Sequence, residues 1–136
     1  KNNDLNNLVN ILKSNSIKNV KLPVSAPFHC HLMSPATEIM KQEFEKVNLV
    51  NGNNILISNV TADEISDKDD LKRLLIDQIE KTVRWRESVN NMIKKGVNHF
   101  IEVGPGKVLS GLVKRISKDV KISTINQESD IKDLKI

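Results

Sequence analysis

The sequence predicts an α/β fold with a mainly parallel sheet. Along its 136 residues, segments with the apolar spacing of amphipathic helices alternate with short runs of apolar and β-branched residues that are typical of strands. Strands separated by helices usually lie parallel, because the chain crosses back over the sheet between them. A chain of this length can bury the core of one domain.

Apolar periodicity and capping residues predict the elements in order. Helices are expected at residues 5–14, 35–47, 67–81, 82–95 and 107–117, strands at 19–24, 55–60, 99–103 and 120–125, and a polar tail at 128–136. Ser34 can cap the second helix, with Pro35 in its first turn. Ser66 and Asp69 form a capping signal for the third helix, and Gly96 is the expected residue just after the fourth. The apolar strand 55–60 is expected to be buried on both faces.

Residues 22–35, LPVSAPFHCHLMSP, contain the first candidate catalytic residue. Pro23 and Pro27 lack a backbone N–H, and each favours extended backbone in the residue before it. We therefore predict a rigid extended loop between strand 19–24 and helix 35–47. His29 lies in this loop beside the helix start, a position typical of a general base. The structural alternative is a packed, hydrogen-bonded loop histidine.

His29, Cys30 and His31 raise two further alternatives, a metal site and a Cys–His nucleophile pair. An extended backbone would place the two histidines on one side and Cys30 on the other. Only His99 or carboxylates could complete a metal site, and no spacing typical of metal ligands is present. We therefore expect no metal.

The chain is mildly basic, with a net charge of +4 and a pI near 9.2. This charge suits acidic partners. A basic nucleic-acid- or protein-binding module, centred on Lys107, Lys114, Arg115 and Lys118, is the alternative function of a different class. The chain has no Tyr and one Trp for base stacking, so no nucleic-acid partner is expected. It lacks an apolar run of about 18 residues, so no membrane span is predicted. The single Cys30 fits a reducing compartment.

Three motifs follow one another in the chain: SAPFH at residues 25–29, VRW at 83–85 and EVGPGKVL at 102–109. With the segments SNVTAD and DQIEKTVRW, they resemble the C-terminal part of the malonyl-CoA:acyl carrier protein transacylases, which load malonyl groups for type II fatty acid synthesis. The resemblance implies that residues 22–136 are the C-terminal part of an α/β-hydrolase-like acyltransferase core. It also implies that residues 1–21 are the last helix and strand of an inserted ferredoxin-like subdomain.

The resemblance also implies roles for individual residues. His29 matches the catalytic histidine, which takes a proton from a serine hydroxyl and returns it to the leaving thiol. The backbone carbonyl of Gln78 would orient its ring. Phe28 matches a residue that lines the acyl pocket and favours malonyl over methylmalonyl, and Val108 lies near the acyl site.

Within the same resemblance, the basic residues Lys107, Lys114 and Arg115 would face an acidic acyl carrier protein. Malonyl-CoA is then the substrate, and no metal or redox cofactor is needed. The protein would work in a bacterial cytoplasm or in a plastid-type organelle.

The chain lacks three features of the family that matter for activity. It contains no G-x-S-x-G, the motif that holds the family's nucleophilic serine in a strand-to-helix turn. The malonyl-binding arginine and the oxyanion glutamine also belong to the family's N-terminal part. We therefore expect the chain to act as a part of the enzyme, with the N-terminal part as its partner. Without that part, an exposed core face is expected to cause homo-oligomerisation or poor solubility.

Overall fold

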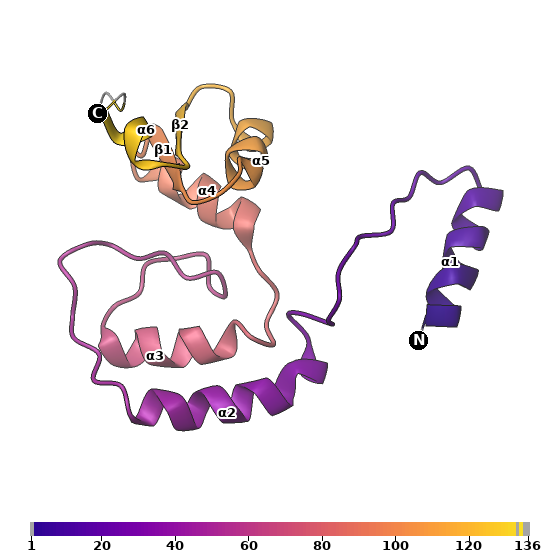
Figure 1. The fold of residues 1–136 in the computed structure, drawn as a ribbon, viewed down its shortest axis with the longest axis horizontal. Helices are drawn as coiled ribbons and strands as arrows, with labels where there is room; N and C mark the ends of the chain where they lie inside the picture. The colour runs from indigo at the N-terminus through magenta and orange to yellow at the C-terminus, as the bar shows by residue number, and fades with distance from the viewer. Residues whose placement is uncertain (1, 133, 135–136) are drawn as a thin grey trace.

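The computed structural model describes residues 2–132 and 134, and its elements are labelled in Figure 1. In chain order they are α1 (Asn2–Ser14), the short 3-10 helix η1 (His31–Met33), α2 (Ser34–Glu45), α3 (Lys68–Asp77), α4 (Trp85–Lys94), β1 (His99–Val103), α5 (Val108–Ile116), β2 (Lys121–Ile125) and α6 (Glu128–Lys132).

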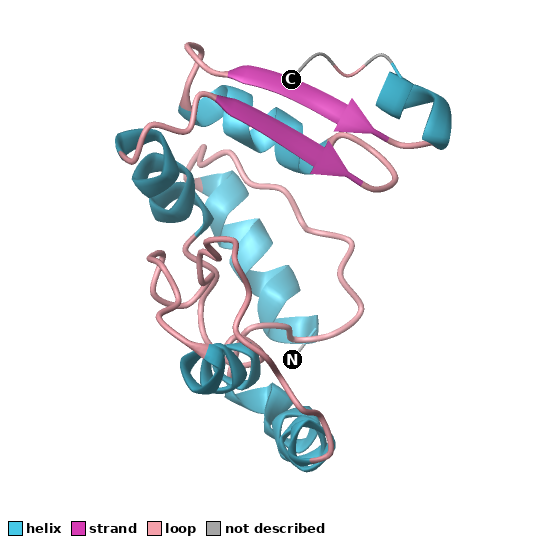
Figure 2. Ribbon diagram, turned by 90° about the vertical axis from the view of Figure 1, so that its left-hand side faces the viewer, coloured by secondary structure: helices cyan, strands magenta, loops and turns pink. Residues whose placement is uncertain are grey.

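The parallel arrangement predicted from the sequence is present. β1 and β2 pair in parallel, with Phe100 opposite Ile122 and Val103 opposite Ile125. The crossover helix α5 packs on both strands, and α6 packs on β2. Figure 2 shows the two strands running in the same direction, with α6 beyond their carboxyl ends. The α/β class is therefore confirmed.

One face of this sheet is left open in the part of the chain that the structure describes. Glu102 faces α5, because its carboxylate accepts hydrogen bonds from the backbone of that helix. Since side chains alternate along a strand, Ile101 and Val103 point to the opposite face. Val103 is 75% exposed there. Parallel sheets are normally covered on both faces, so this face lacks a packing layer.

The helices form two packing groups. α2 packs against α3, whereas α4 packs against α5 and thereby joins the sheet. Among the described residues, α1 packs against no other helix or strand, and Figure 1 shows it standing apart on an extended connection. The assignment of residues 1–21 to a separate subdomain stays a prediction, and Lys1 lies outside the described residues.

Two of the four predicted strands are wrong. Residues 19–24 have no regular secondary structure. Residues 55–60 form only one isolated antiparallel bridge, from Ile57 to Glu64, and Ile55 is 72% exposed instead of buried. A strand is stable when a neighbour completes its ladder of hydrogen bonds. No described segment pairs with residues 19–24, and residues 63–65 lie beside residues 56–58 for only a single bridge.

Several predicted boundaries also shift. Ser34 is the first residue of α2 and not its cap, because η1 has already coiled the chain before it. The cap of α3 is Asp67, whose side chain accepts hydrogen bonds from the amides of Asp69 and Asp70. The predicted polar tail contains α6. Gly96 follows α4 with a φ of +96°, as expected for a residue that ends a helix.

The predicted helix 67–81 ends early, and this shift affects the candidate site. α3 stops at Asp77, and residues 78–80 form a turn. The carbonyl of Gln78 therefore lies at a helix end, where carbonyls have no partner within the helix.

The apolar core of the described chain is small. Its buried apolar residues are Ala62, Leu74, Val89 and Val113. Many large apolar side chains are exposed on α1, α2, residues 17–28 and β1. Apolar surface on this scale usually marks an interaction site or causes aggregation. We therefore expect light scattering on the isolated chain to detect oligomers or aggregates at micromolar concentration. A stable monomer at high concentration would contradict this expectation.

Candidate active site

His29 adopts a backbone conformation that its sequence context did not predict. Its φ is +59°, so the chain turns at residues 28–30 and does not continue as the expected extended loop. Non-glycine residues rarely have a positive φ, although His is among those that adopt it more often. Such a conformation costs about 1–3 kcal/mol and persists where surrounding contacts hold it. The turn also breaks the alternation assumed for His29, Cys30 and His31.

The contact that holds His29 is a hydrogen bond to the turn after α3. The Nδ1 atom of His29 lies 2.8 Å from the backbone oxygen of Gln78, which is 49 residues further along the chain. A carbonyl oxygen can only accept, so Nδ1 carries the hydrogen and Nε2 keeps its lone pair. The predicted contact between His29 and Gln78 is therefore confirmed. In this tautomer, Nε2 can accept a proton from a nucleophile.

The side chain of Gln78 has a partner of its own. Its Oε1 accepts a hydrogen bond from Nδ2 of Asn59 at 3.3 Å, and the Asn59 carbonyl accepts one from the amide of Arg84 at 2.8 Å. Asn59 belongs to the SNVTAD segment, but the motif assigned it no role, because this contact joins residues 19 positions apart.

The loop that contains Asn59 is itself tied to α4. Asn91 donates a hydrogen bond from Nδ2 to the carbonyl of Ala62 at 2.9 Å, and Arg84 donates one from Nη1 to the carbonyl of Thr61 at 3.0 Å. Ala62 is buried and has a φ of +61°. The SNVTAD segment is therefore held by α4 and in turn holds the side chain of Gln78.

The GPGK turn joins β1 to α5. Gly104 and Gly106 have positive φ values, and the amide of Gly106 donates to Oδ1 of Asn126 at 2.7 Å. At the base of the turn, the Glu102 carboxylate accepts from the amides of Leu109 and Ser110. The side chain and backbone of Ser110, together with the Leu109 amide, lower the pKa of Glu102 below its ordinary value. An ionised carboxylate therefore fixes the start of α5.

Phe28 and Val108 are both exposed in the described chain, at 56% and 71%. Phe28 precedes His29, and Val108 is the first residue of α5. Among the described residues, no hydrogen bond or ion pair links the GPGK turn to the pair formed by His29 and Gln78. The structure thus brings His29 and Gln78 together and leaves the two apolar candidates open to a further partner.

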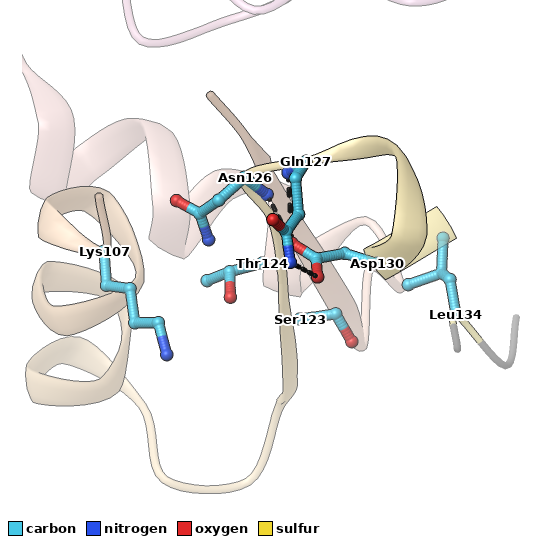
Figure 3. Close-up of a pocket in the computed structure, with 7 residues that line it drawn as sticks. All are labelled: Lys107, Ser123, Thr124, Asn126, Gln127, Asp130 and Leu134. Carbon is cyan, nitrogen blue, oxygen red and sulfur yellow. Dashed lines mark hydrogen bonds between the residues drawn. The ribbon is translucent and has the colours of Figure 1, made fainter. Parts of the chain in front are cut away.

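Lys107 lies at the edge of an open cavity of about 580 Å³. Figure 3 shows its other lining residues, Ser123, Thr124, Asn126, Gln127, Asp130 and Leu134. The Asp130 carboxylate accepts from the backbone amides of Asn126 and Gln127. These bonds, with a smaller contribution from the Lys107 charge, lower the pKa of Asp130. Lys114 and Arg115 are exposed in the last turn of α5.

No group of three or more His, Cys, Asp or Glu side chains is placed to hold a metal ion among the described residues. Likewise, no helix in the described part of the chain has the length and apolar character to cross a bilayer. Cys30 donates a hydrogen bond from Sγ to the carbonyl of Pro27 at 3.1 Å.

Comparison with solved structures defines the class of protein. The fold matches that of an acyl-carrier-protein S-malonyltransferase from Bartonella henselae, with a TM-score of 0.83 and 40% sequence identity over 92% of this chain and 40% of that one. It also matches a malonyl CoA-acyl carrier protein transacylase from Clostridium perfringens, with a TM-score of 0.82 and 37% identity over 91% and 39% of the two chains. The fold is that of the C-terminal part of an acyltransferase.

Curated relatives with similar sequences are malonyl CoA-acyl carrier protein transacylases. Malonyl CoA-acyl carrier protein transacylase from Bacillus subtilis is 42% identical over 122 residues, which make up 89% of this chain and 38% of the relative. The same enzyme from Escherichia coli K12 is 39% identical over 79% of this chain and 35% of the relative. No protein-family model matches the chain. By sequence and by structure, the chain is a homologue of the malonyl CoA-acyl carrier protein transacylases and spans about two-fifths of their length.

Proposed function

We propose that this chain provides the general base for malonyl transfer from malonyl-CoA to the phosphopantetheine thiol of an acyl carrier protein. The observation that supports this most strongly is the hydrogen bond from Nδ1 of His29 to the Gln78 carbonyl. It leaves Nε2 free to accept a proton, and the strained backbone of His29 is typical of functional sites. The names of the relatives supply the substrate and the acceptor.

In the proposed reaction, Nε2 of His29 accepts the proton of a serine hydroxyl while the serine oxygen attacks the thioester carbonyl of malonyl-CoA. The tetrahedral intermediate collapses, the carbon–sulfur bond breaks, and the histidine returns the proton to the leaving coenzyme A thiolate. The carrier-protein thiol then attacks the malonyl-serine ester by the same steps in reverse. Throughout these steps, the Gln78 carbonyl accepts the hydrogen bond from Nδ1–H and so holds the orientation of the ring.

The partner that supplies the serine is, in this proposal, the N-terminal part of the enzyme. The exposed face of the sheet, with Ile101 and Val103, and the exposed Phe28 and Val108 give it apolar surface to cover. A second copy of the chain could cover the same face, which gives the oligomer expected above. No metal or redox cofactor takes part in the proposed steps. The bacterial relatives support a location in a bacterial cytoplasm.

The experiment that tests the proposed function is a transfer assay with the complete polypeptide, meaning this chain joined to the N-terminal part of the enzyme. Malonyl from labelled malonyl-CoA should appear on the carrier-protein thiol and not on a carrier whose phosphopantetheine is absent. Labelled acetyl-CoA at the same concentration serves as the matched substrate without the second carboxylate. Absence of malonyl transfer, or equal transfer of acetyl, would overturn the proposal.

Phe28 is proposed to restrict the acyl group, because its ring fills the space that an extra methyl group needs. We expect Phe28→Ser in the complete polypeptide to shift the kcat/KM ratio of methylmalonyl-CoA to malonyl-CoA upward by about 10-fold to 200-fold, the usual value of one methyl group. The control is Leu32→Ser, which changes an exposed apolar residue four positions further along. An unchanged ratio in Phe28→Ser would remove Phe28 from the acyl site.

Lys107, Lys114 and Arg115 are proposed to bind the acidic carrier protein. We expect the double variant Lys114→Glu/Arg115→Glu to raise the KM for the carrier at low salt and to leave the KM for malonyl-CoA unchanged. Lys94→Glu, at the end of α4, is the control for charge reversal elsewhere. Equal effects of both charge reversals would contradict a local docking surface. A salt-dependent gel shift with DNA or RNA would favour the nucleic-acid alternative instead.

A further inference from the structure

The turn after α3 is joined to α2 by a short hydrogen bond. The hydroxyl of Thr37 donates to Oε1 of Glu80 at 2.6 Å. Thr37 is only 6% exposed, and Glu80 is half-buried in the turn 78–80. Hydrogen bonds to a carboxylate are shorter and stronger than those between neutral groups. The contact joins residues 43 positions apart, so it holds together two segments that are distant in the sequence.

Both ends of this bond are close in the chain to the candidate catalytic pair. Thr37 is eight residues after His29, and Cys30, η1 and the start of α2 connect the two without a flexible loop. Glu80 is two residues after Gln78 in the same turn. The bond between His29 and Gln78 and the bond between Thr37 and Glu80 therefore join the same two segments at neighbouring points.

We infer that Thr37 and Glu80 are positioning residues, whose hydrogen bond holds the turn 78–80 against α2 and so keeps the Gln78 carbonyl on Nδ1 of His29. The inference rests on the proposed function in one point, the role of His29 as a general base. The strained backbone of His29 needs contacts that over-determine it, and a carbonyl in a short turn needs a second anchor to keep its direction.

Few side chains of α2 and α3 are buried in the described chain. Ile39 and Met40 of α2 are both exposed, and Leu74 is the one buried residue of α3 among those described. The polar contact at the end of the two helices therefore has a larger share in fixing their relative position. Asn59 holds the Gln78 side chain from the other side, but its hydrogen bond is longer at 3.3 Å.

An open cavity lies beside the hydrogen bond between Thr37 and Glu80, so the chain should still fold when this bond is removed. The cavity has a volume of about 330 Å³, and its lining includes Thr37, Asp77, Glu80 and the cationic side chains of Lys41 and Lys81. If Thr37 loses its hydroxyl, water from this cavity can hydrate the Glu80 carboxylate, so no dry unpaired charge is left. Variants at Thr37 should thus loosen the turn without unfolding the chain.

The test is nitrogen NMR of His29 in the complete polypeptide, with this chain joined to the N-terminal part, at a pH high enough to keep the ring neutral. In Thr37→Val, which keeps the shape and removes the hydroxyl, we expect the ratio of the Nδ1–H to the Nε2–H tautomer to fall about threefold. Thr37→Ser should restore the ratio. Glu38→Gln, next in the chain and exposed, is the matched control and should leave the ratio unchanged.

The second variant, Glu80→Gln, keeps the size of the side chain and removes its charge. It should lower the tautomer ratio in the same direction, and the double variant with Thr37→Val should lower it by less than the product of the two single effects. If Thr37→Val does not fold by circular dichroism, Glu80→Gln decides alone. An unchanged ratio in the folded variants overturns the inference. This experiment measures the tautomer ratio and not the transfer activity. Its outcome is therefore independent of the malonyl-transfer assay that tests the proposed function.

Discussion

Incubated alone with malonyl-CoA, the 136-residue chain should keep its mass. The sequence contains no G-x-S-x-G, and His29 by itself has no hydroxyl to activate. Removing the nucleophile from a serine protease lowers kcat by about 10⁶-fold. The malonyl-binding arginine expected from the family resemblance is missing as well, so affinity for the malonyl carboxylate should also suffer.

Intact-mass spectrometry makes this measurement directly. The positive control is a complete malonyl CoA-acyl carrier protein transacylase, which should gain one malonyl group under the same conditions. Cys30 needs its own control, because a thiol can be acylated by a thioester without an enzyme. The expected spectrum of Cys30→Ser is the same as that of the unchanged chain. A malonyl adduct on a serine of this chain would show that it carries a nucleophile that the proposal does not recognise.

His29→Ala in the complete polypeptide should slow acylation of the serine by about 10⁴-fold or more. The proton of the serine hydroxyl then has no acceptor at the distance that Nε2 provides. The Gln78 carbonyl cannot replace it, because that oxygen belongs to the backbone and is not basic. Rapid-quench measurement of malonyl-enzyme formation isolates this step from the later transfer to the carrier.

His31→Ala is the matched control, because it removes an imidazole two residues away in η1. Its acylation rate should stay within about twofold of the unchanged protein, as is usual for exposed residues outside the site. A similar loss in both variants would point to a folding effect, and a normal rate in His29→Ala would end the assignment of the base.

The elements whose partners lie nearby in the chain could be predicted from the sequence. The strands at residues 99–103 and 121–125 form because α5 brings one onto the other, and all three lie within 27 residues. The segments 19–24 and 55–60 are apolar in the same way, but no described neighbour pairs with them along their length. Apolar patterning reports a tendency to be buried, and the pairing of a strand depends on what lies beside it.

In the candidate site, too, contacts between residues distant in the sequence could not be predicted from local patterns. The family resemblance gave the contact between His29 and Gln78, which the motifs alone could not have provided. The positive φ of His29 and the hydrogen bonds of Asn59 and Thr37 had no signal in the sequence. These bonds join residues that are 19 and 43 positions from their partners, and local propensities carry no information about such contacts.

The most direct test of the account mixes this chain with the N-terminal part of a malonyl CoA-acyl carrier protein transacylase. After addition of malonyl-CoA, the intact mass of each polypeptide is measured by mass spectrometry. The account predicts one malonyl group on the N-terminal part, on the serine of its G-x-S-x-G motif, and no change in the mass of this chain. The adduct should be absent when this chain is left out or contains His29→Ala. A malonyl group that forms equally well without this chain, or with His29→Ala in place of the unchanged one, would contradict the claim that His29 is the base.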